Sequence, residues 1–179
     1  MPPLKKKKAE GMTRRMVLAA TGAAAVGATV VGGTTYVRWW NQPPGRSLQA
    51  LSREEYEVVQ RLAEAWMPPG SGPPDLSGAE AECGRFVDEV CVRMRADQRK
   101  LLKLALQIVD RVPYVTTFKT LRQLDRYEAA PHLEAMLQSD IFYLRQGVGA
   151  IMALIALGYT SHPEVAPTIS PWFNCGFGR

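Results

Sequence analysis

The sequence predicts an all-α protein: a compact bundle of about five or six helices with an extended C-terminal tail, preceded by a separate N-terminal helix. Two observations lead to this fold class. Beyond residue 50, apolar residues recur at helical spacing in successive segments, and start signals of the Ser-x-x-Glu type precede two of them. No stretch shows the alternation of apolar and polar residues that is typical of a half-buried strand.

The N-terminal helix is predicted from a basic segment that is followed by an apolar one. Lys5 to Lys8 and the motif Thr13-Arg14-Arg15 precede an uncharged run, rich in Ala, Gly, Thr and Val, that extends to Gly33. A basic start before an apolar run is the layout of an export signal. The two adjacent arginines narrow this to a twin-arginine signal, the address of a pathway that carries folded proteins.

Two interpretations of this segment stay open: cleavage after export, or retention as a membrane anchor. Trp39 and Trp40 follow Arg38, a composition that suits a membrane interface and equally a linker. Only loose candidates for a cleavage site occur, at Ala28-Thr29-Val30 and Gly33-Thr34-Thr35.

The positive charge of the chain belongs to its N-terminal part. The whole chain carries +5, but residues 1–46 hold eight Lys or Arg against one acid, whereas residues 47–179 hold fourteen against sixteen. The body is therefore nearly neutral, which argues against a nucleic-acid partner. We predict a twin-arginine signal with linker over 1–46 and an all-helical domain with a docking tail over 47–179.

The first two helices of the body are predicted from repeated start signals. Ser52 with Glu55 forms a capping box, and Met67-Pro68-Pro69-Gly70 ends the helix that it opens. Its apolar positions are Tyr56, Val59, Leu62, Ala63 and Trp66. Ser77 with Glu80 opens the second helix. The apolar stripe of that helix consists of Cys83, Phe86, Val87, Val90, Cys91 and Met94.

Three shorter predictions come next along the chain. Asp97 caps a third helix, which ends before Pro113. Its apolar residues at helical spacing are Leu101, Leu104, Ala105 and Ile108. A short fourth helix holds Phe118, Leu121 and Leu124. Pro131 opens a fifth, which holds Leu133, Met136 and Leu137.

The last helix is predicted from about Asp140 to Leu157, with Gly158 as its stop. Its uncharged part is about a dozen residues, short of the roughly 20 that a membrane span needs, so a buried central helix is favoured. Gly147 and Gly149 lie inside this helix rather than after a strand, which predicts close helix packing and no dinucleotide site. Phe86 and Ile151 are predicted to be buried on facing helices.

The C-terminal tail carries three aromatic residues, Trp172, Phe173 and Phe177, around Cys175. With its prolines and glycines it predicts a segment that docks on a partner, and the alternative is that it folds back onto this domain. Cys175 is predicted either to form a disulfide across that interface or to stay a free thiol.

Residues with catalytic chemistry do not form a recognisable set. Cys83 and Cys91 lie eight residues apart on one helix face, too far for a disulfide and poorly placed for one metal, so they are predicted to be small core residues. His132 and His162 have no matched carboxylate or thiolate. We therefore expect no catalytic, cofactor-binding or metal-binding residue in this chain.

The body resembles the small subunit, subunit 3 or gamma, of gluconate 2-dehydrogenase and related membrane-bound sugar and alcohol dehydrogenases. The resemblance covers roughly residues 51 to 170 and shows no family pattern over 113–130. It rests on Thr13-Arg14-Arg15 and on Leu51-Ser52-Arg53-Glu54-Glu55 leading to Met67-Pro68. It rests also on the closing segment, Arg145 to Leu154 and Leu157-Gly158-Tyr159 to His162-Pro163-Glu164-Val165.

The resemblance implies that this chain is not the catalyst. In that family a large flavoprotein binds FAD, a cytochrome c subunit with haem c often takes the electrons, and the small subunit helps the large one to mature and to pass the twin-arginine translocase. We expect a non-catalytic accessory subunit at the periplasm or the periplasmic face of the inner membrane. The alternatives are a stand-alone helical binding protein and a small enzyme with a site around His162 or Cys175.

Overall fold

The computed structural model describes residues 42–70 and 74–169, so the predicted export signal and C-terminal tail lie outside the described residues. Contacts divide the chain into two units, 1–42 and 43–179, and the helices described below belong to the second unit. Its regular structure in the described ranges is helical throughout, which confirms the all-α fold class. The elements are α2 (Arg53–Trp66), α3 (Cys83–Arg93), α4 (Ala96–Arg111), α5 (Tyr114–Thr117), the 3-10 helix η1 (Leu121–Gln123), α6 (Arg126–Leu137), α7 (Phe142–Ser161) and α8 (Ala166–Ile169).

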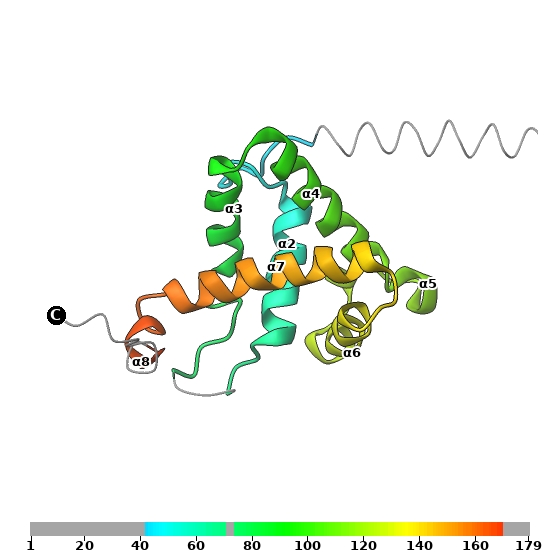
Figure 1. Cartoon of the computed structure of the whole chain (residues 1–179). Helices are drawn as coiled ribbons and strands as arrows, with labels where there is room; N and C mark the ends of the chain where they lie inside the picture. Colours follow the sequence, from blue (N-terminus) through cyan, green and yellow to red (C-terminus); the bar gives the residue numbers. More distant parts are fainter. Residues whose placement is uncertain (1–41, 71–73, 170–179) are drawn as a thin grey trace, which may run out of the picture. The chain divides into compact units, whose positions relative to one another are not determined.

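Two helices, α2 and α7, hold the domain together (Figure 1). Each of them packs on the other and on α3, α4 and α6. Their inward stripes supply much of a core whose largest fully buried side chains include Leu51, Leu62, Leu106, Leu121, Met136, Ile151 and Ile155. The predicted capping box opens α2: Ser52 Oγ accepts from the Glu55 amide at 3.3 Å, and Glu55 Oε2 accepts from the Ser52 amide at 2.8 Å.

The second helix begins later than predicted. Glu80 does accept a hydrogen bond from the Ser77 amide at 2.8 Å, but residues 78–82 form turns and α3 starts at Cys83. Gly78 lies against α2 so closely that a Cβ there would stand 2.4 Å from the Ala63 carbonyl oxygen. The chain then turns at Glu82, whose φ of 49° is left-handed. Packing on α2 therefore overrides the local start signal.

The predicted cap and the singled-out apolar residues of α4 were both wrong in detail. The helix is preceded by Arg95 without a side-chain cap, and Asp97 lies in the first turn. The inward residues of α4 are Leu102, Leu106 and Val109, together with Gln107 and Asp110. Of the residues chosen from spacing, Leu101 and Ile108 are exposed and Leu104 is half-buried, whereas Ala105 is half-buried and packs against the core.

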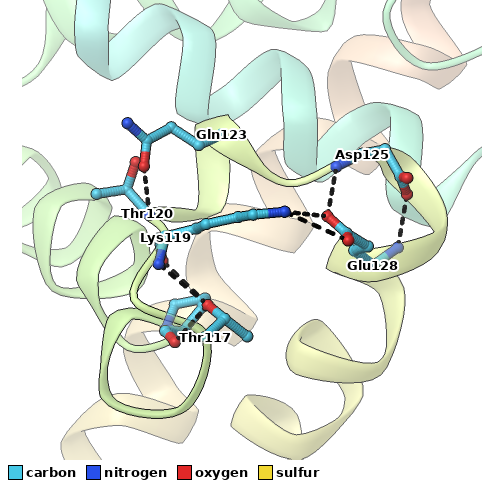
Figure 2. Close-up of polar contacts among 7 residues, drawn as sticks. Thr117, Lys119, Thr120, Gln123, Asp125 and Glu128 are labelled. Carbon is cyan, nitrogen blue, oxygen red and sulfur yellow. Dashed lines mark hydrogen bonds and ion pairs between the residues drawn. The ribbon is translucent and has the colours of Figure 1, made fainter.

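The segment predicted as one short fourth helix forms two separate turns of helix. Phe118 ends α5 in a left-handed conformation with φ of 56° and is exposed, so α5 and η1 cannot be continuous. η1 begins as a new helix after Thr120. The Gln123 side chain accepts a hydrogen bond from the Thr120 amide at 2.9 Å (Figure 2). Leu121 and Leu124 are buried as core residues.

The fifth predicted helix, α6, starts one and a half turns before the predicted residue Pro131. Asp125 is its N-cap and accepts from the Glu128 amide at 2.8 Å, while Glu128 also pairs with Lys119 at 3.4 Å (Figure 2). Pro131 lies inside the helix, where its ring nitrogen cannot bond to the carbonyl of Tyr127. The capping box outweighs the proline as a start signal.

The last helix is longer than predicted, and Gly158 does not end it. α7 continues to Ser161, and a Cβ on Gly158 would stand 3.0 Å from a ring atom of Phe86, so this glycine allows α3 to pack closely on α7. Ile151 is buried as predicted, whereas Phe86 is only half-buried. Among the described residues, α7 is the one helix long and apolar enough to cross a membrane by length and composition, a test that core helices also pass.

Candidate docking surface

The outward face of α4 and the neighbouring face of α7 form an apolar groove. It consists of two adjoining hollows of about 610 and 530 Å³. The first hollow is lined by Leu101, Leu104, Ala105, Ile108, Val109, Val112, Ile141, Tyr143, Leu144, Gln146 and Gly147. The second is lined by Met94, Gln98, Leu101, Leu102, Ala105, Gly147, Ala150, Ala153 and Leu154. We call these two hollows together the α4–α7 groove.

Small residues give the groove its depth. Leu101, Ala105 and Gly147 line both hollows, and a Cβ on Gly147 would stand 3.4 Å from Ala105 Cβ. α7 and α4 therefore approach closely here, which confirms the close packing predicted for Gly147. Gly149 behaves differently, because a Cβ there would meet nothing within 4 Å. The prediction for Gly149 was wrong: that glycine faces open space.

Large apolar side chains around the groove are left in water. Leu101 is 66% exposed, Ile141 64% and Tyr143 85%. Burying a side chain of this size is worth about 1.5–3 kcal/mol, a gain that this surface forgoes within the domain. Contiguous apolar patches on a soluble domain mark interaction sites, whereas scattered single residues do not. The groove is therefore the candidate functional site.

Two exposed aromatic pairs belong to the start of α7 and to α5, the short helix that follows α4. The rings of Phe142 and Tyr143 meet edge to face with centroids 5.6 Å apart. The rings of Tyr114 and Phe118 do so at 6.1 Å. Since Tyr143 also lines the first hollow, the Phe142–Tyr143 pair extends the apolar surface beyond the groove itself.

A buried polar cluster fixes the side of α4 that faces inward. Glu55 on α2 accepts from Lys103 at 3.1 Å and from Gln107 at 2.9 Å, both on α4. Lys103 also donates to the Ala50 carbonyl at 3.1 Å. These contacts turn one stripe of α4 toward α2. The opposite stripe, which includes Leu101 and Ile108, therefore lines the groove.

Asp88 anchors the segment that leads into α2. Its Oδ1 accepts from the amides of Ala50 at 2.9 Å and Leu51 at 2.7 Å, and its Oδ2 from the amide of Gln49 at 2.8 Å. Asp88 is itself buried on α3. A carboxylate that accepts three backbone hydrogen bonds is a strong anchor, because bonds to a charged acceptor are stronger than neutral ones.

A second ion-pair group joins α4 to η1. Asp110 Oδ2 lies 3.6 Å from Arg122 Nε, and Arg122 also pairs with Glu54 at 3.0 Å. Burial raises the pKa of the Asp110 carboxyl, and the amide and guanidinium of Arg122 oppose that rise. This group ties the inward side of α4 to the start of α2.

The two described cysteines are core residues, as predicted. Cys83 and Cys91 are free and fully buried, and burial raises the pKa of each thiol to about 11. Thiols held protonated in this way are poor nucleophiles and poor metal ligands. His132 and His162 are half-buried and lie on different elements, α6 and the turn after α7. Over 42–70 and 74–169, no three His, Cys, Asp or Glu residues are grouped to hold a metal ion.

The residues predicted as functional fall outside the described ranges. They are Thr13, Arg14 and Arg15 of the export signal and Trp172, Phe173, Cys175 and Phe177 of the tail. The groove itself was missed, although α4 carried a signal for it. Between Leu101 and Val109 that helix has seven apolar residues, more than a single inward stripe can bury.

No family model, curated protein or solved structure matches this chain. The groove and the residues around it are therefore the main guide to function.

Proposed function

We propose that this chain is the non-catalytic accessory subunit of an exported FAD-dependent sugar or alcohol dehydrogenase complex. The observation that supports this most is the α4–α7 groove, an apolar surface that the domain leaves uncovered. A small subunit that binds a larger protein needs such a surface, since the buried centre of an interface is apolar and poor in charge. The resemblance to subunit 3 of gluconate 2-dehydrogenase supplies the class of partner.

In this proposal the parts of the chain divide the work. The N-terminal signal or anchor helix, with Thr13, Arg14 and Arg15, directs the complex to the twin-arginine translocase, and the helix remains in the inner membrane if it is not cleaved. The bundle holds the large subunit through the groove. FAD belongs to the large subunit, and haem c to a cytochrome c subunit where one is present. The extended tail, with Trp172, Phe173, Cys175 and Phe177, adds contacts around the same partner.

A matched pair of variants tests the groove. Ile108→Glu places a charge in the first hollow, where Ile108 is 47% exposed, and Val92→Glu places the same charge on α3 outside the groove, at 41% exposed. Both should fold. Ile108→Glu should lose the large FAD protein on purification of the complex, and Val92→Glu should keep it. Equal retention by both variants would rule the groove out as the contact.

Export gives a second, independent test. Replacing Arg14 and Arg15 together by Lys should hold this chain and the large subunit in the cytoplasm, because the pathway reads that pair. Fractionation and detection of both subunits measure the result. If the large subunit is exported normally in cells that make the double variant, this chain does not carry it through the translocase.

A stand-alone periplasmic or membrane-anchored binding protein is the second candidate. The volume of the first hollow, about 610 Å³, lies in the range of small-molecule pockets. Purification distinguishes the two functions: an accessory subunit is recovered with a large FAD protein, whereas a stand-alone binding protein is recovered alone and exchanges apolar small molecules.

A further inference from the structure

We infer that the part of the large subunit that occupies the α4–α7 groove is an amphipathic helix with an acidic edge. This inference rests on the proposed function, because it takes the large subunit as the partner, and it adds the form and the charge of the segment that binds. The spacing of the lining residues indicates the form, and the charge of α4 indicates the acidic edge.

Both walls of the groove present lining residues at the spacing that receives a helix. The α4 wall repeats at intervals of four, three and four residues, through Leu101, Ala105, Ile108 and Val112. The α7 wall repeats at the same intervals, through Tyr143, Gly147, Ala150 and Leu154. Alternating intervals of three and four residues form the seam along which one helix packs on another, whereas the side chains of an extended strand repeat every two residues. Two such seams on neighbouring helices therefore fit a third helix.

The size of the groove also suits a helix. Ala105, Gly147 and Ala150 are small, so the backbone of a partner can come close to both walls, and packed helices lie about 8–10 Å apart depending on the side chains at the contact. Each wall extends over eleven residues, from Leu101 to Val112 and from Tyr143 to Leu154, which is about 16 Å or three turns. A partner helix of about three turns would cover the exposed apolar side chains of both walls.

The charge of α4 differs from that of the rest of the body. Residues 93–111 hold six Lys or Arg against two Asp, whereas residues 47–92 and 112–179 hold eight Lys or Arg against fourteen acids. One base and one acid of the first set turn inward, Lys103 to Glu55 and Asp110 to Arg122. The positive charge of the domain is therefore concentrated along one wall of the groove.

Lys100 places part of this charge at the edge of the groove. It is exposed, and it precedes Leu104 of the first hollow by four residues, so the two side chains are neighbours on one face of α4. The other acid of this stretch, Asp97, pairs with Arg95 at 3.4 Å. Complementary charges across an interface favour the correct partner, so a helix that lies in the groove should present Asp or Glu toward Lys100.

A second copy of this chain does not supply that acidic edge. α7 contains no Asp or Glu from Phe142 to Ser161, and its one charged residue is Arg145. Two copies that met through this face would therefore set the basic wall of one against uncharged or basic surface of the other, and like charges brought together oppose association.

Zero-length coupling tests the acidic edge. In the purified complex with the large FAD subunit, a carbodiimide joins an amine to a carboxylate that touches it, so Lys100 should become linked to an Asp or Glu of the large subunit. Lys100→Arg keeps the positive charge but has no amine to couple, and this matched control should form the complex and lose the mapped link. A complex in which Lys100 forms no link to the large subunit overturns the inference.

Photo-crosslinking tests the helical form. A benzophenone amino acid is placed at position 101 in one variant and at position 108 in another, two turns or about 10 Å apart on α4. A helix that runs along α4 should be attached at sites about seven residues apart, whereas an extended segment would be attached about three residues apart. A spacing of about three, or attachment scattered over the large subunit, overturns the inference while the proposed function stands. If no large FAD subunit is recovered with the native chain, both fail.

Discussion

The two sides of α4 are built in opposite ways. On the inward side, Lys103 and Gln107 are polar residues with defined partners on α2, and they lie beside fully buried leucine and valine side chains. On the outward side, Leu101 and Ile108 are apolar residues in contact with water. Hydrophobicity alone therefore does not tell the inside of this helix from the outside. The inward side provides stability, and the outward side leaves an apolar surface uncovered, which we propose serves for binding.

The largest effect is expected where the structure depends on a buried charge. Asp88→Ala leaves the buried amides of Ala50 and Leu51 without an acceptor. Each such donor lowers the free energy of unfolding by about 1–3 kcal/mol, or about 2–6 kcal/mol for the two together. Asp88→Asn keeps an oxygen for these two amides and should lose much less. Urea unfolding of both variants measures the difference. Equal losses would show that the charge, rather than the hydrogen bonds, anchors this segment.

The next prediction compares two isoleucines, Ile151 in the core and Ile108 in the groove. Ile151→Ala opens a cavity in the core and should lower the free energy of unfolding by about 2–5 kcal/mol. Ile108→Ala removes the same atoms from the groove and should cost under about 1 kcal/mol, because its side chain is already half in water. If both variants lose the same amount on thermal unfolding, the groove is part of the core.

An effect that depends on pH should appear in alkaline solution. The pKa of the Cys83 and Cys91 thiols is raised from 9.0 to about 11, so the folded state keeps these protons after the unfolded state has released them. Their contribution to stability is complete below pH 9 and is lost as the pH rises through 11. The double variant Cys83→Ala, Cys91→Ala should lose less stability between pH 9 and 11 than the native chain. Parallel stability curves would contradict the raised pKa values.

The smallest effect is expected from a polar residue in the groove. Leu101→Ser exchanges an exposed leucine for serine and should change the free energy of unfolding by no more than about 0.5 kcal/mol. The same variant should weaken recovery of the large subunit. A loss of several kcal/mol in urea unfolding would mean that the outward side of α4 serves stability after all.

Local chemistry made part of the fold predictable. The Ser52–Glu55 capping box opens α2 as expected, because its hydrogen bonds join residues three apart and need nothing from the rest of the chain. The all-α class was equally accessible, because helical spacing is visible in single segments. The start of α3 was not predictable in this way, since it depends on Gly78 lying against Ala63 of another helix.

The seven apolar residues between Leu101 and Val109 indicate surplus apolar surface on α4, but the position of the groove depends on how α4 is turned. Lys103, Gln107 and Asp110 recur at helical spacing, a pattern that also describes a solvated face. Only their partners, Glu55 and Arg122, show that this polar stripe is the inward one. Gly158 is a similar case, because a glycine near a helix end serves as a stop or as a packing site, and Phe86 decides between them.

The anchoring of residues 49–51 by Asp88 also has a mechanical side. Any force that pulls on the N-terminal segment enters the bundle along these residues and meets three hydrogen bonds that end on a single carboxylate. The load then passes to α3, thirty-eight residues later in the chain than Ala50, before it reaches α2. During synthesis the same three amides emerge well ahead of their acceptor and stay bound to water until Asp88 arrives. The point at which the chain can be pulled therefore becomes anchored only after α3 has been made, and before α4, α6 and α7 exist.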